Sequence, residues 1–225
     1  MSLISSRPAR IVTATCLIAT ALLSVVSLLT QPSFAGDTAD RLASVEEGGA
    51  SAAVSIMAFT LSQLPFAIAV VGVALFVGVR ARRTAIAGGV LGLLGAFGHT
   101  VFGGFGLTQL AMAPSGQRAA MAEVVEEVES GPAAVFMGVG LLGTVLGLLL
   151  LGIALFRSRA VPRWIPVAMW GFLVIEFVGT NLSEWASPAA GILYVAATGG
   201  LAMQVLSNGG QRETASRQAA AVSRS

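Results

Sequence analysis

Lysine is absent from the 225-residue chain, and charged residues of any kind make up only 11% of it. Soluble domains carry about 25% charged residues, so this shortage excludes an ordinary soluble domain. A formal net charge of +2 without a long basic run also excludes the phosphate-tracking surface of a nucleic-acid-binding protein. With 55% hydrophobic residues, the remaining class is a membrane protein with several spanning helices.

Histidine and cysteine occur once each, which limits the chemistry that the chain can host. A bis-histidine haem needs two histidines, and a tetrahedral zinc site needs more ligands than His99 and Cys16 supply. The sequence has no Walker loop and no serine in a nucleophile-elbow context. We therefore predict no metal, no cofactor and no catalytic residue. An enzyme stays an open class that is less favoured than a non-catalytic protein.

Apolar stretches divide the chain into six segments, each long enough to cross a bilayer core, which takes about 20 residues. The fold class predicted from this pattern is an all-α polytopic bundle. Its transmembrane domain covers residues 11–207, after a cytoplasmic N-terminus over 1–10 and before a flexible cytoplasmic tail over 208–225. The predicted spans lie near 11–33, 54–79, 84–111, 133–156, 164–183 and 189–207.

The first of these stretches also has features of a cleaved signal peptide. Arg7 and Arg10 precede it, and Ser33, Phe34 and Ala35 before Gly36 form a small-x-small cleavage pattern. The apolar run is longer than the hydrophobic part of a usual signal peptide, so we favour an uncleaved first helix. Sequencing of the mature N-terminus distinguishes the two.

The few charges are divided unevenly between the two sides of the predicted membrane. Arginines gather at the N-terminus, after the second and fourth spans and in the tail, at Arg7, Arg10, Arg80, Arg82, Arg83, Arg157, Arg159, Arg163, Arg212, Arg217 and Arg224. Acidic residues gather in the predicted extracytoplasmic loops 34–53 and 112–132 and before the last span, at Asp37, Asp40, Glu46, Glu47, Glu123, Glu126, Glu127, Glu129 and Glu184. By the positive-inside rule both termini are cytoplasmic, in a multi-pass protein of the plasma membrane.

The second acidic loop carries a helical pattern of its own over residues 115–130. Met121, Val124, Val125 and Val128 recur with the spacing of one helix face, and the glutamates fall off that face. We expect the apolar face to rest on the bundle or on the membrane boundary. The glutamates lack the spacing of a calcium loop, so we expect a solvated surface rather than a cation site.

His99 and Glu176 lie inside predicted spans, where ionisable groups are costly and prompt a functional hypothesis. Counted from the nearest cytoplasmic arginine at about 1.5 Å per residue, both reach the middle of the membrane or slightly beyond it. We expect these two side chains to meet in one polar layer. Its candidate neighbours are Gln63, Thr144, Tyr194 and Asn181.

Glycines share the helix face that carries His99. They follow one another in steps of three and four residues, at Gly88, Gly92, Gly95, Gly103 and Gly106. Small residues at this spacing let a second helix approach closely. The pattern predicts a helix-packing face and places His99 against protein rather than lipid.

Three interpretations of the polar layer remain open. It is a packing contact that fixes helix register, a solute site or proton relay that changes protonation, or the acid–base pair of an intramembrane enzyme. We take forward a protein that binds or moves a small solute or proton. The alternative is a structural or accessory subunit that packs through its glycine-rich faces.

One structural feature separates these two functions. A water-accessible cavity that reaches His99 favours the first, and a closed His99–Glu176 pair with an exposed glycine face favours the second. The predicted surroundings are the lipid bilayer, with a second copy or another membrane protein as the open partner classes. We expect no nucleic-acid partner, and the sequence does not identify a small-molecule ligand.

The overall pattern resembles small six-helix bacterial membrane proteins of unknown function. The features that carry this likeness are the chain length, the acidic outer loops, Gly-Ala-Phe-Gly-His at 95–99 and Pro162-Arg163-Trp164 before the fifth span. The likeness extends over about residues 8–207. It implies a plasma-membrane location, and it supplies no activity and no catalytic residues.

Overall fold

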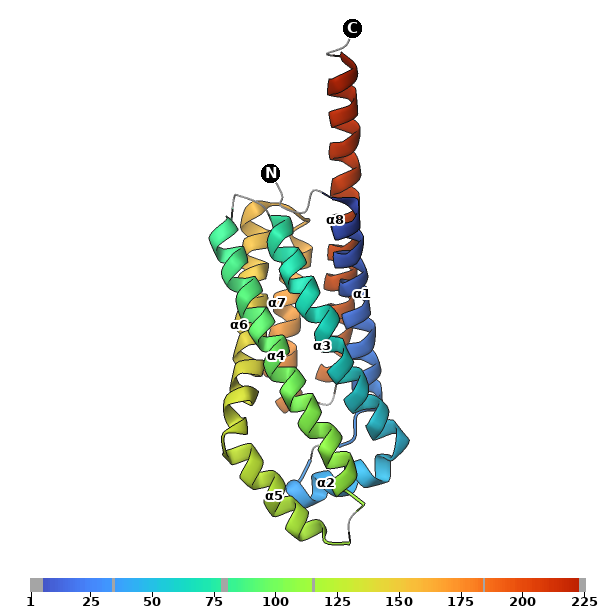
Figure 1. Ribbon diagram of the computed structural model, residues 1–225, viewed down its shortest axis with the longest axis vertical. Coiled ribbons are helices and arrows are strands. Elements are labelled where there is room, and N and C mark those ends of the chain that lie inside the picture. Colours follow the sequence, from blue (N-terminus) through green and yellow to red (C-terminus); the bar gives the residue numbers. More distant parts are fainter. Residues whose placement is uncertain (1–5, 34, 78–80, 115, 184, 223–225) are drawn as a thin grey trace.

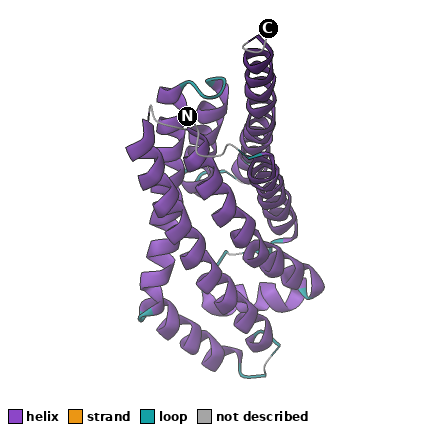
Figure 2. Cartoon of the chain, turned by 45° about the horizontal axis from the view of Figure 1, so that its top comes forward, coloured by secondary structure: helices purple, strands orange, loops and turns teal. Residues whose placement is uncertain are grey.

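The computed structural model describes residues 6–33, 35–77, 81–114, 116–183 and 185–222, and of Asn181 and residues 208–222 it describes the backbone alone. All regular secondary structure in these ranges is helical (Figure 2). The helices are α1 (Arg7–Thr30), α2 (Thr38–Gly48), α3 (Ala50–Val77), α4 (Arg82–Met112), α5 (Arg118–Ser130), α6 (Ala133–Ser158), α7 (Trp164–Phe177), the 3-10 helix η2 (Gly179–Asn181) and α8 (Ala186–Val222).

Six helices stand side by side as a bundle, and α2 and α5 lie across one end of it (Figure 1). Around the bundle each helix packs against two neighbours, in the order α1, α3, α4, α6, α7, α8 and back to α1. The first residues of α1 and the last of α8 lie at the end opposite α2 and α5 (Figure 1). The six helices therefore form a closed ring around a common interior.

Five helices of the described chain are long and apolar enough to cross a membrane, which agrees with a multi-pass membrane protein. They are α1, α3, α4, α6 and the Ala186–Ser207 part of α8, close to five of the predicted spans. The remaining predicted span, the fifth, over 164–183, differs, because α7 ends at Phe177 and is shorter than a usual span. The count of six spans stays a prediction.

The chain beyond Phe177 leaves the α-helix where small and polar residues follow. Thr180 donates its hydroxyl hydrogen to the carbonyl oxygen of Glu176, which takes one of the acceptors that a helix leaves unpaired at its C-terminal end. The Leu182 amide donates to the Gly179 carbonyl at 2.8 Å, closing a tighter turn. Glu176 consequently lies in the last turn of α7 rather than in the middle of a long helix.

The closest helix contact in the bundle joins α4 to α6 through glycines on both helices. A Cβ placed on Gly95 would come within 2.5 Å of the Thr144 amide nitrogen, and one on Gly143 within 2.6 Å of the Gly95 nitrogen. One on Gly98 would collide with the backbone of Phe136 and Gly140. Side chains at these points would force the two backbones apart, so the glycines fix the distance between the helices.

The predicted glycine face contacts two helices rather than one. Gly88 and Gly95 face α6, and Gly92 lies between α6 and Val70 of α3. Gly103 and Gly106 face α3, where a Cβ would meet Thr60 and Ile56 respectively. The glycine face is therefore buried within the chain, because α4 crosses from one neighbour to the other along its length.

The acidic end of the bundle is covered by α2 and α5, which pack against each other. Leu42 and Val45 of α2 are buried in one apolar cluster with Ala122 and Val125 of α5. The α5 helix confirms a helix in the second loop, although Val124 of the predicted apolar face is exposed, and α2 is a helix that we did not predict. A capping box that begins at Asp37, the N-cap of α2, is the sequence signal for it.

Both described arginines at this end form ion pairs that join α2 to α5. Arg41 forms an ion pair with Glu129 at 3.0 Å, and Arg118 forms one with Glu46. Several acidic residues of this end remain exposed, namely Asp37, Asp40, Glu47, Glu123, Glu126 and Glu127. Arg80, Glu184 and Arg224 of the predicted charge distribution lie outside the described residues.

The last helix extends past the predicted end of its span. The backbone of α8 stays helical to Val222 and projects beyond the rest of the bundle (Figure 1). The part of it that is long and apolar enough to cross a membrane covers Ala186–Ser207, and the boundary between the last span and the tail stays a prediction. The flexibility of residues 208–225 remains a prediction.

Candidate functional site: a central cavity

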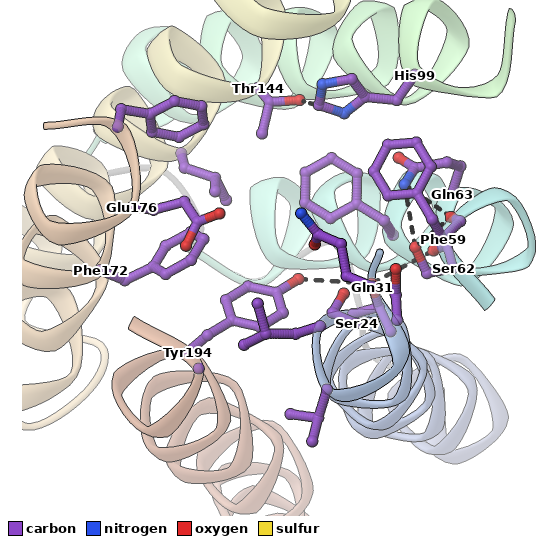
Figure 3. A pocket seen from close by; sticks show the side chains of 18 residues that line it. Ser24, Gln31, Phe59, Ser62, Gln63, His99, Thr144, Phe172, Glu176 and Tyr194 are labelled. Atoms are coloured by element: carbon purple, nitrogen blue, oxygen red, sulfur yellow. Dashed lines mark hydrogen bonds between the residues drawn. The ribbon is translucent and has the colours of Figure 1, made fainter. Parts of the chain in front are cut away.

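A cavity of about 220 Å³ lies inside the ring, and each of the six bundle helices contributes to its wall (Figure 3). The wall combines aromatic rings with hydroxyl, amide, imidazole and carboxylate groups. The polar lining residues are Thr20, Ser24, Ser27, Gln31, Ser62, Gln63, His99, Thr144, Glu176 and Tyr194. The space reaches Gln31, an exposed residue directly after α1, on the side of the bundle that carries α2.

His99 lies on the cavity wall, where its side chain contacts both α6 and α3. Its Nδ1 and the Thr144 hydroxyl are hydrogen-bonded at 3.4 Å, and its ring lies 5.5 Å from the Phe59 ring, centre to centre. A Cβ on Gly140 would come within 2.7 Å of His99 Cδ2. The imidazole therefore fits against the helix backbone at Gly140, where any larger residue would collide with it.

A second polar group on the cavity wall joins α1, α3 and α8. The Thr20 hydroxyl donates to the Ser62 carbonyl at 3.3 Å and lies 3.4 Å from the Tyr194 hydroxyl. Because Thr20 has one hydroxyl hydrogen, the Tyr194 hydroxyl is the donor in the second contact. Gln63 donates its amide to the Phe59 carbonyl and to the Ser62 hydroxyl, both at 3.0 Å.

Glu176 differs from the other described lining residues because its side chain carries a formal charge. It points from α7 into the cavity (Figure 3). Within the described part of the chain, neither a hydrogen bond nor an ion pair reaches its carboxylate oxygens. Beside it, the rings of Phe172 and Tyr194 pack with their centres 4.7 Å apart. The site thus contains a half-buried carboxylate next to aromatic faces.

The structure brings five of the six predicted polar-layer residues to one cavity. His99, Glu176, Gln63, Thr144 and Tyr194 all line it. The expected direct meeting of His99 and Glu176 is replaced by a shared space, because no hydrogen bond or ion pair joins them among the described residues. The Asn181 side chain lies outside the described residues.

The first helix supplies lining residues that the sequence prediction omitted. Thr20, Ser24 and Ser27 follow one another at helical spacing on one face of α1 and all line the cavity. This spacing of small hydroxyl residues in an apolar helix was a usable signal. The lining phenylalanines carried no signal, because aromatic residues are common throughout such helices.

Residues 12–215 match the family model of DUF4386, a domain of unknown function. The chain belongs to this family. Membership in DUF4386 assigns no activity, and the matched residues include all those that line the cavity. Comparisons with curated proteins and with solved structures find no match.

The chemistry of this DUF4386 site follows from its donors and acceptors. No group of three histidine, cysteine, aspartate or glutamate side chains lies together in the part of the chain that the structure describes. The wall instead offers one carboxylate, one imidazole, neutral hydrogen-bonding groups and aromatic faces. This combination is typical of a site that binds a small molecule, where an apolar wall surrounds a few polar groups.

Proposed function

We propose that this DUF4386 protein is a multi-pass protein of the bacterial plasma membrane that binds or moves a small solute through its central cavity. The observation that carries the proposal is the space itself: His99 and Glu176 line a cavity instead of closing on each other. A pair that only fixed helix register would leave no room between its members. A relay that moves a proton directly between these two residues has less support, since no hydrogen bond connects them in the described chain.

The alternative, an accessory subunit that packs through glycine faces, has less support from the contacts of α4. Its glycine face is occupied by α6 and α3 of the same chain. A partner helix would find the backbone at Gly88, Gly95 and Gly103 already covered. The solute site is therefore the better-supported function.

The proposed topology has six spans, with α7 and η2 together forming a short sixth crossing. Both ends of the chain then face the cytoplasm, and α2 and α5 face outward, because arginines mark the side opposite α2 and α5. Retention of α1 fits this proposal, since Thr20, Ser24 and Ser27 line the cavity. A cysteine in place of Glu126 should react with an impermeant thiol reagent in intact cells, and reaction only after lysis would contradict this topology.

A ligand-stabilisation screen on the purified full chain tests the function. Small amines, carboxylic acids, alcohols and sugars are added, and the melting temperature is measured for the wild type and for His99→Ala, Glu176→Gln and Glu126→Gln. A solute site predicts a compound that stabilises the wild type and Glu126→Gln, whose change lies on the exposed surface of α5, and that loses its effect in the two cavity variants. Failure of the whole set of compounds, with both cavity variants merely less stable, would favour a packing role.

A further inference from the structure

We propose that the solute bound in this cavity is a compact organic cation, held by the Glu176 carboxylate and by the faces of Phe172 and Tyr194. The inference rests on the proposed function, because it names the class of solute for the same cavity. It goes further by assigning the sign of the charge, the size of the solute and the residues that recognise it.

The charge of the cavity wall determines the sign of the charge on the solute. Glu176 is the only residue among the described lining residues that carries a formal charge, and neither lysine nor arginine is among them. An anionic solute would meet a carboxylate and find no positive partner. A cation would supply the counter-charge that Glu176 lacks within the described chain, which makes the burial of both charges less costly.

The aromatic wall favours an organic cation over a bare metal ion. Five aromatic side chains line the space, at Phe59, Phe66, Phe172, Phe177 and Tyr194. Aromatic faces attract alkylammonium groups through the ring quadrupole, and the attraction is strongest where water is excluded. Hard metal cations need several oxygen ligands, and a single carboxylate supplies too few of them. A charged nitrogen with a small apolar body matches both parts of the wall.

The size of the cavity limits the solute to a compact molecule. Its volume of about 220 Å³ lies below the range of roughly 300–1,000 Å³ that is usual for pockets that hold drug-sized ligands. The space reaches Gln31, the residue after the C-terminal end of α1. The helices α2 and α5 lie at that end of the bundle (Figure 1). Exposed carboxylates on these two helices would raise the local concentration of cations at that end.

Three probes of nearly the same shape test the assignment of charge. Choline carries the positive charge, 3,3-dimethylbutan-1-ol replaces its nitrogen by carbon and is neutral, and 3,3-dimethylbutanoate is an anion. Binding of each probe to the full-length protein in lipid nanodiscs is measured by equilibrium dialysis. We expect choline to bind at least about tenfold more tightly than the alcohol, because ion pairing and cation–π contact act on it alone, and we expect no binding of the anion.

Variants then identify the residues that cause the preference for choline over the alcohol. Glu176→Gln keeps the size of the side chain and should bring the affinities of choline and the alcohol together, and Phe172→Leu should weaken choline binding more than alcohol binding. Glu126→Gln makes the same charge change on the exposed surface of α5 and should leave the choline affinity within about twofold, since exposed charges are screened. A thermal melt of each variant verifies that it is folded.

The outcomes separate this proposal from the one on which it rests. Equal binding of choline and the alcohol, or a choline preference that persists in folded Glu176→Gln, would overturn the cation assignment while a solute site remains. Failure of all three probes to bind would also overturn it. The broader ligand screen then decides independently whether the cavity binds any solute at all.

Discussion

The two sides of His99 are packed in opposite ways. Toward α6, glycines bring two helix backbones so close that a single added methyl group would collide, as at Gly98. Toward α1, α7 and α8, the same ring of helices encloses an open space lined by hydroxyl groups, aromatic rings and Glu176. The His99 side chain thus lies between the close α4–α6 contact and the central cavity.

The contrast indicates how a small membrane bundle keeps a polar cavity open. In lipid, helices associate through close packing and hydrogen bonds, because the bilayer is as apolar as the helix surfaces. The α4–α6 contact supplies close packing, and the hydrogen bonds of Thr20 tie α1 to α3 and α8 across the cavity wall. The close α4–α6 contact supports the helices around the cavity. Substitutions in this contact and substitutions in the cavity should therefore differ in their effects on stability and on ligand binding.

The largest loss of stability is expected on the closely packed side. Gly98→Ala places a methyl group against the backbone of Gly140 and should lower the free energy of unfolding by about 1–3 kcal/mol. Gly104→Ala, on the same helix with open space around it, should change stability by less than about 0.5 kcal/mol. Thermal or SDS unfolding of both variants measures the difference, and equal stabilities would contradict the close α4–α6 contact.

A smaller effect of opposite sign is expected at Glu176. Glu176→Gln removes a half-buried charge without breaking a contact in the described chain, so it should stabilise the ligand-free protein by about 1 kcal/mol. Glu129→Gln, which breaks the ion pair with Arg41, should instead cost up to about 1 kcal/mol. Unfolding measured without ligand distinguishes them, and a destabilised Glu176→Gln would mean that the carboxylate has a partner.

A weaker coupling is expected where the two sides meet. A double-mutant cycle of His99→Ala and Thr144→Val isolates the 3.4 Å hydrogen bond between α4 and α6. We expect an interaction free energy of about 0.6 kcal/mol, the average for polar contacts between membrane helices. Additive effects of the two substitutions would show that His99 is held by packing alone.

Filling the cavity is expected to change ligand binding far more than stability. Ser24→Leu removes a hydrogen bond to Tyr194 and adds apolar atoms that enter existing space, so the free energy of unfolding should change by less than about 1 kcal/mol. It should nevertheless abolish stabilisation by any ligand found in the screen. A variant that unfolds as readily as Gly98→Ala would show that the space around Ser24 is closed.

The sequence predicted the helical bundle well, because apolar length and charge distribution act along the chain. Five spans match long apolar helices within a few residues. The fifth predicted span, 164–183, was too long, since apolar composition alone did not show that the chain would turn after Phe177. The α2 helix was missed because the acidic segment 34–53 was interpreted as a loop, although the sequence contains its capping box at Asp37.

The site was predicted in part for a similar reason. A depth estimate along each helix placed His99, Glu176, Gln63, Thr144 and Tyr194 at one level, and these five residues share the cavity. Depth does not give the rotation of a helix or its distance from a neighbour. The separation of His99 from Glu176 therefore required the structure, as did the glycines of α6, at Gly140, Gly143 and Gly147, that oppose α4.

The most direct test of a solute-accessible cavity compares two cysteines on α1. In a Cys16→Ala background, which removes the only native thiol, Ser24→Cys faces the cavity and Leu22→Cys lies on the outer surface of the bundle, where Leu22 is 58% exposed. Reaction with a water-soluble thiol reagent is followed in lipid nanodiscs. We predict rapid labelling at position 24 and little at position 22, where lipid excludes the reagent. Equal rates, or no reaction at either position, would contradict it.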